Sequence, residues 1–163
     1  IKYGVILGLV SVIMAVLTNL LGGADPMNPN PAVSVGLGCG GFIISIVIIV
    51  MAVKSIRDSS FNDGKISLGD AFLIGFLSAL IGTVIAALYN YINLTLINPE
   101  QLEVVREMME ESMESVEEEA QGVVSFFTNF ATNPTMQFFS TLVFGAIFNA
   151  IIAIIVAAIM KKD

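Results

Sequence analysis

The stretch TMQFFSTLVFGAIFNAIIAIIVAAIM, Thr135–Met160, decides the fold class because it contains no charged residue. A helix needs roughly 20 apolar residues to cross the ~30 Å hydrocarbon core of a bilayer. Three other apolar segments approach or exceed that length: Ile1–Leu21, Val33–Val53 and Leu68–Leu96. They are continuous apolar runs, whereas the strands of a membrane barrel alternate apolar and polar residues. The sequence therefore predicts an all-α polytopic membrane protein with four transmembrane helices.

Composition supports this class and excludes several others. Of the 163 residues, 56% are hydrophobic and 13% are charged, whereas soluble domains contain about 25% charged residues. The 7 basic and 14 acidic residues give a net charge of −7, which argues against a nucleic-acid partner. Histidine is absent and Cys39 is the single cysteine, so internal disulfides, cysteine-cluster zinc sites and histidine chemistry are excluded.

The basic residues predict the orientation in the membrane. Most of them flank the two termini and the second connection: Lys2, Lys54, Arg57, Lys65, Lys161 and Lys162. The first connection has none, and the third has Arg106 alone. Because cytoplasmic segments carry the excess of Lys and Arg, both termini are predicted to be cytoplasmic. Residues 1–163 then form one four-helix domain, with residues 98–132 as an extracytoplasmic helical insertion. The first apolar segment exceeds the length of a signal-peptide core, so we expect an uncleaved span.

Two positions carry signals for helix starts. Ser67 and Asp70 have the spacing of a capping box, in which a hydroxyl and a carboxylate satisfy amides at a helix N-terminus. Asp70 also has a second interpretation as a proton or cation site at the membrane edge. Asn98 precedes Pro99 and Glu100, a sequence that predicts an N-cap, a first-turn proline and an acidic first turn.

The insertion between spans three and four is amphipathic. Apolar residues recur at helical spacing, beginning with five candidate partner contacts: Leu102, Val105, Met109, Met113 and Val116. The stripe continues to Phe127, with a bend or break expected at Gly122, and glutamates repeat on another face. Three interpretations are open. The stripe packs on the outer ends of the spans, it docks on another protein, or the carboxylates bind a divalent cation.

Small residues recur along all four spans. In lipid, close helix packing depends on such residues, because the hydrophobic drive for association is absent. The candidate packing positions are Gly4, Gly8, Gly36, Gly40, Gly75, Gly82, Ala146, Ala150 and Ala153. They are expected to pack within one bundle or against partner subunits, which include second copies of the chain.

Signals for catalysis are missing from the sequence. It has no nucleophile elbow, phosphate-binding loop, His-containing metal motif or pair of intramembrane carboxylates. Ser11, Thr83 and Asn149 are isolated neutral residues at membrane depth, where hydrogen bonds between helices account for them. We therefore predict no catalytic residue, no metal site, no cofactor and no enzyme activity. The leading hypothesis is a non-catalytic accessory or structural subunit of a larger membrane complex. A small oligomeric channel or transporter is the alternative.

Two stretches carry a family resemblance: GKISLGDAF, Gly64–Phe72, followed by Gly75, and INPE, Ile97–Glu100. The turn, cap and Asn-Pro-Glu positions occur in this order, and the chain resembles the domain of unknown function 4199 family over essentially its whole length. The resemblance implies a small four-span protein of the bacterial inner membrane with an acidic helical insertion between spans three and four. It implies no particular activity, cofactor or catalytic residue.

Overall fold

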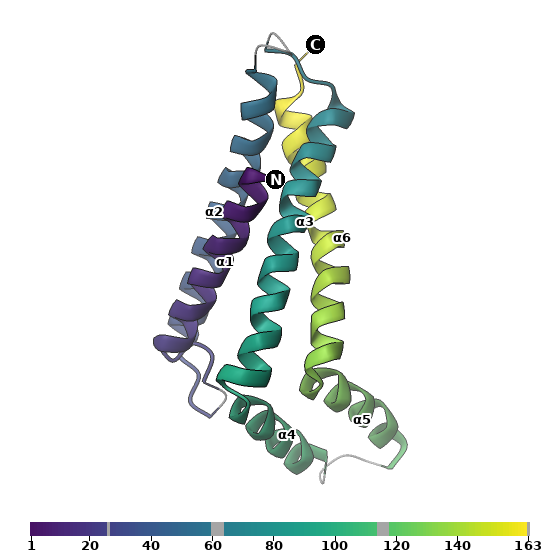
Figure 1. Cartoon of the computed structure of the whole chain (residues 1–163). Helices are drawn as coiled ribbons and strands as arrows, with labels where there is room; N and C mark the ends of the chain where they lie inside the picture. Colours follow the sequence, from purple (N-terminus) through teal and green to yellow (C-terminus); the bar gives the residue numbers. More distant parts are fainter. Residues whose placement is uncertain (26, 60–63, 114–117, 163) are drawn as a thin grey trace.

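A computed structural model of the chain describes residues 1–25, 27–59, 64–113 and 118–162 (Figure 1). The described part is helical, without a strand. Its elements are α1 (Lys2–Leu20), α2 (Pro31–Arg57), α3 (Leu68–Ile92), η1 (Asn93–Ile97), α4 (Glu100–Met113), α5 (Glu118–Thr132) and α6 (Pro134–Met160). Four helical segments, α1, α2, α3 with η1, and α6, are long and apolar enough to cross a membrane. The protein is therefore a multi-pass membrane protein.

Asparagine and proline define where two of these helices begin. The Asn30 side chain accepts a hydrogen bond from the Val33 N–H at the start of α2 (3.3 Å). Asn133 Oδ1 accepts from the N–H groups of Thr135 and Met136 at the start of α6 (3.0 and 3.2 Å). A proline follows each asparagine, and its missing N–H costs nothing in the first turn of a helix. The observed spans therefore begin slightly earlier than the apolar runs alone predicted.

Helix α3 lies at the centre of the bundle. It packs most extensively against α6 on one side and α1 on the other, and α2 completes the bundle beside α1 (Figure 1). At its end α3 continues into η1, a π-helical turn, so the helical segment reaches Ile97. This arrangement makes α3 the element that holds the other three spans together.

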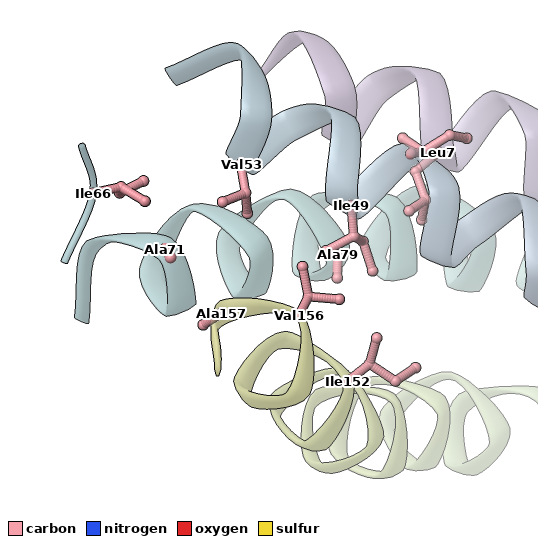
Figure 2. Close-up of a cluster of buried hydrophobic side chains, with 10 residues drawn as sticks. Leu7, Ile49, Val53, Ile66, Ala71, Ala79, Ile152, Val156 and Ala157 are labelled. Atoms are coloured by element: carbon pink, nitrogen blue, oxygen red, sulfur yellow. The ribbon is translucent and has the colours of Figure 1, made fainter. Parts of the chain in front are cut away.

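The tightest packing lies toward the end of the bundle that holds the termini. Figure 2 shows Ile49 and Val53 of α2 in one cluster with Ala71 of α3 and Val156 of α6, and both α2 side chains are almost fully buried. Ala71, Ala79 and Ala157 allow the helices to approach there, and all belong to the same buried cluster. Backbone hydrogen bonds between Ile66 and Lys162 (3.0 and 3.2 Å) tie the α2–α3 connection to the C-terminus.

The insertion consists of two separate helices, α4 and α5, and not of one helix with a bend or break at Gly122. Helices α4 and α5 contact each other, and α5 turns away from the end of α6 (Figure 1). Gly122 lies inside α5, so the helix does not break at this residue. Instead, α4 ends at Met113 and α5 begins at Glu118.

Candidate functional site

Two glycines of α1 bring that helix close to α3. A Cβ atom at Gly4 would lie 2.8 Å from the backbone oxygen of Ser78 and 2.7 Å from Ile81 Cβ. At Gly8 a Cβ would lie 2.6 Å from Ile85 Cβ. Both glycines are buried, so the close approach of α1 to α3 depends on their having no side chain. On α3, Gly82 is likewise buried, and it makes room for Leu7 of α1.

The contact between α3 and α6 uses two further glycines. Gly75 is buried beside Ala153, whose Cβ would be 3.5 Å from a Cβ at position 75. Gly145 of α6 faces Thr83 of α3, where an added Cβ would lie 2.6 Å from Thr83 Cγ2. Gly145 was not among the residues predicted from the sequence, because its pairing with Thr83 depends on how α3 and α6 are aligned. Its small size allows Thr83 to approach α6.

One helical turn beyond Gly145, a polar pair joins the two helices. Asn149 Nδ2 donates a hydrogen bond to Thr83 Oγ1 (2.7 Å), and the Thr83 hydroxyl donates to the Ala79 carbonyl (3.1 Å). The hydrogen bond between helices expected for Thr83 and Asn149 is therefore present. Ser11 differs, because its hydroxyl donates within α1 to the Leu7 carbonyl (3.0 Å).

Beside this pair lies a cavity of about 730 Å³ between α1, α2, α3 and α6. Leu, Ile and Phe make up half of the residues in its wall. Hydroxyl and amide side chains from all four helices also line it: Ser11, Ser45, Thr83, Ser140, Thr141 and Asn149. Its volume is within the range of ordinary ligand pockets. The cavity is the strongest candidate site for a small molecule in the described part of the chain.

The charged residues that the structure describes lie outside this cavity. Ser67 caps α3 by accepting a hydrogen bond from the Asp70 N–H (3.1 Å), and its hydroxyl donates to Asp70 Oδ2 (2.7 Å). Asp70 is exposed at the start of α3 and is not part of the cavity wall. At the end of α2, Arg57 Nε donates to Asp58 Oδ1 (2.8 Å), and this hydrogen bond holds the pKa of Asp58 below its ordinary value.

A second candidate site is the face of α2 that points away from the bundle. Gly36 is exposed, and a Cβ there would meet no atom within 4 Å, so Gly36 makes no close helix contact within the described part of the chain. Ile43 and Val47, which share this face at helical spacing, are 61% and 51% exposed. Gly40 is half-buried beside Met14, and the predicted packing residues Ala146 and Ala150 are also half-buried.

The predicted partner stripe lies on α4. Leu102, Val105 and Met109 are half-buried there, and α4 lies beside η1 and α5. The structure describes Met113 only as the last residue of α4, and Val116 lies outside the described residues. The stripe therefore belongs to a helical hairpin with α5, a pairing that none of the three interpretations had included.

The junction between η1 and α4 depends on Asn98. Its side-chain Nδ2 donates to Asn93 Oδ1 (2.9 Å), and its backbone carbonyl accepts from the Gln101 backbone N–H (3.2 Å). The Asn98 side chain thus bonds back to η1, which differs from the predicted side-chain cap of α4, because Asn98 also ends the π-helical turn. Gln101 Nε2 donates to Asn19 Oδ1 (3.3 Å) and links α4 to α1.

Comparison with known families adds one match. The family described as protein of unknown function (DUF4199) matches residues 2–162. The chain belongs to the DUF4199 family. This result confirms the resemblance inferred from the Gly64–Phe72 and Ile97–Glu100 stretches. No curated protein and no solved structure gave a match to this DUF4199 protein.

Proposed function

We propose that this DUF4199 protein is a non-catalytic accessory or structural subunit of a larger complex in the bacterial inner membrane. The observation that carries the proposal is the uncovered small-residue face of α2. Gly4, Gly8, Gly75 and Gly82 are buried at contacts inside the bundle, whereas Gly36 is exposed and has no neighbour there. Lipid chains make no specific contact at an exposed glycine, whereas the backbone of a partner helix can approach closely there. The partner is another membrane-protein subunit or a second copy of the chain.

The distribution of basic residues supports cytoplasmic termini. All basic residues except Arg106 flank the termini or the α2–α3 connection, and hydrogen bonds join Ile66 of that connection to Lys162. An excess of Lys and Arg on one side is typical of the cytoplasmic side. The α4–α5 hairpin then lies on the outer side, where its acidic residues contact water.

Copurification from membranes tests the subunit role. The tagged chain is extracted in gentle detergent, and retained proteins are identified by mass spectrometry. Replacing Gly36→Leu should reduce the retained partner at least tenfold, because a bulky side chain blocks close helix approach. Gly38→Leu is the matched control. Gly38 is also exposed with no atom within 4 Å of an added Cβ, and it lies about 200° from Gly36 around the helix.

The two variants also define the result that contradicts the subunit role. Equal retention in Gly36→Leu and Gly38→Leu would show that this face is not the contact. A homogeneous monomer without any retained protein, even after crosslinking in membranes, would refute the subunit role itself.

The polar side chains that line the cavity favour a second candidate function, a small oligomeric channel or transporter. Its neutral hydroxyl and amide groups at membrane depth could line part of a path for a solute. Reconstituted liposomes distinguish the two functions. Flux of an ion or small solute that Ala86→Phe blocks, by filling the cavity, would support transport. Absence of flux across a panel of ions and neutral solutes would refute it.

A further inference from the structure

The polar groups of the cavity are almost all hydrogen-bond acceptors. Every hydroxyl in its wall donates to a carbonyl of its own helix: Ser11 to Leu7, Ser45 to Gly41, Thr83 to Ala79, and Ser140 and Thr141 to Gln137. The hydroxyl oxygens keep lone pairs that can accept further hydrogen bonds. The cavity therefore offers hydrogen-bond acceptors to an occupant, while the hydroxyl protons already form hydrogen bonds within their own helices.

Asn149 is the strongest of these acceptors. Its Nδ2 donates to Thr83 Oγ1, which orients the amide group. No described residue donates to its Oδ1, and this oxygen is not among the buried atoms, so it is accessible to an occupant. Acyl chains supply no donor, and an amide oxygen in an apolar medium without a partner is costly. A molecule that brings a donor to Oδ1 removes this cost, so the wall selects for a donor at this position.

The rest of the wall defines the body of the occupant. Among the described residues no charged side chain lines the cavity, and Leu, Ile and Phe make up half of the residues in the wall. A charged molecule would lose its hydration there without gaining an ion pair. We propose that the cavity binds an uncharged, mainly hydrocarbon alcohol from the membrane, whose hydroxyl donates to Asn149 Oδ1. This inference concerns the chain by itself and is independent of the subunit role.

Competition labelling of the purified chain in lipid nanodiscs tests this site. The probe is a photoreactive hexadecanol, and labelled peptides are identified by mass spectrometry. Hexadecanol and hexadecyl methyl ether compete with the probe. They differ in the O–H donor, so the alcohol should compete about twofold to tenfold better, as expected for one net hydrogen bond. Labels should lie on peptides of α6 and α3 that line the cavity.

Two variants link the labelling to the cavity. Asn149→Leu should remove the difference between alcohol and ether, because it replaces the acceptor by a side chain of similar size. Ala86→Phe should abolish saturable labelling by filling the cavity from α3. Gly36→Leu, which adds bulk on the face of α2 that points away from the bundle, should label like the wild type.

The wild-type protein alone can refute the inference, whatever the stability of the variants. Equal competition by alcohol and ether would show that no donor is recognised. Labelling that does not saturate, or that falls on peptides outside the cavity wall, would show contact with bulk lipid and no site. The labelling results do not depend on whether Gly36→Leu loses its partner. The subunit role and the alcohol site can therefore be refuted independently.

Discussion

The side chain of Asn149 on α6 donates a hydrogen bond of 2.7 Å to the Thr83 hydroxyl on α3. The pair lies in the wall of the main cavity, next to the point where Gly145 allows α6 to approach Thr83. It therefore joins the two most extensively packed spans and orients the amide that faces the cavity.

A double-mutant cycle measures the strength of this pair. Thr83→Val and Asn149→Leu each remove one partner with little change in size. The coupling energy should be about 0.6 kcal/mol and at most ~1.7 kcal/mol, as for other hydrogen bonds between membrane helices. Unfolding by SDS in mixed micelles gives the four free energies. Strictly additive effects would show that the pair does not stabilise the α3–α6 contact.

Gly4→Ala should destabilise the bundle by about 1–3 kcal/mol, because the new methyl group would overlap the backbone of α3. The added Cβ would lie 2.8 Å from the Ser78 oxygen. Gly38→Ala, with open space around the new atom, should be neutral or stabilise by up to about 1 kcal/mol. The same SDS titration compares them. Equal stability of the two variants would contradict the close α1–α3 contact.

Cysteine labelling checks the orientation. After Cys39→Ala removes the native thiol, a cysteine introduced by Glu110→Cys should react with a membrane-impermeant reagent in intact spheroplasts. One introduced by Lys65→Cys should react only after permeabilisation. Both positions are exposed, so access depends on the side of the membrane. The reverse pattern would overturn the orientation inferred from the basic residues.

Helix α5 should lie in the membrane interface. Residues 120–160 carry no charge, and Phe126 and Phe127 are 65% and 60% exposed. Burying each ring in lipid is worth about 1.5–3 kcal/mol. The chain has no tryptophan, so Phe127→Trp gives a single fluorophore. Its emission should be blue-shifted and quenched by brominated lipids.

The matched fluorophore on α4 is Met108→Trp, since Met108 is 48% exposed. It should be quenched by acrylamide in water and only weakly by brominated lipids. Similar acrylamide quenching at both positions would place α5 in water. A blue-shifted Phe127→Trp emission without bromine quenching would mean that protein, and not lipid, covers the rings.

The sequence predicted the spans well because each depends on local properties. An apolar run such as Thr135–Met160 must be helical in lipid, and Asn133 with Pro134 determines where the helix begins. The Gly64–Phe72 stretch likewise contains the Ser67 cap that the structure places at α3. These features require no knowledge of how one helix lies against another.

The candidate sites could not be located in this way. The pairing of Asn149 and Gly145 with Thr83 depends on the relative position of two helices that lie far apart in sequence. Gly36 and Gly4 both occur in glycine pairs at four-residue spacing, yet Gly4 is buried and Gly36 is exposed. Spacing reveals a small-residue face, but the packing of the whole bundle decides whether that face is already covered.

Site-specific photocrosslinking in native membranes tests whether the face of α2 that carries Gly36 contacts a partner. A photoreactive amino acid is placed at position 36 or, as a control, at position 38 of the full chain. Position 36 should give a discrete adduct with another membrane protein or with a second copy of the chain, because Gly36 faces away from the bundle. Position 38 should give at least tenfold less of that adduct. Lipid adducts alone at position 36, or equal protein adducts at both positions, would show that this face is not a partner contact.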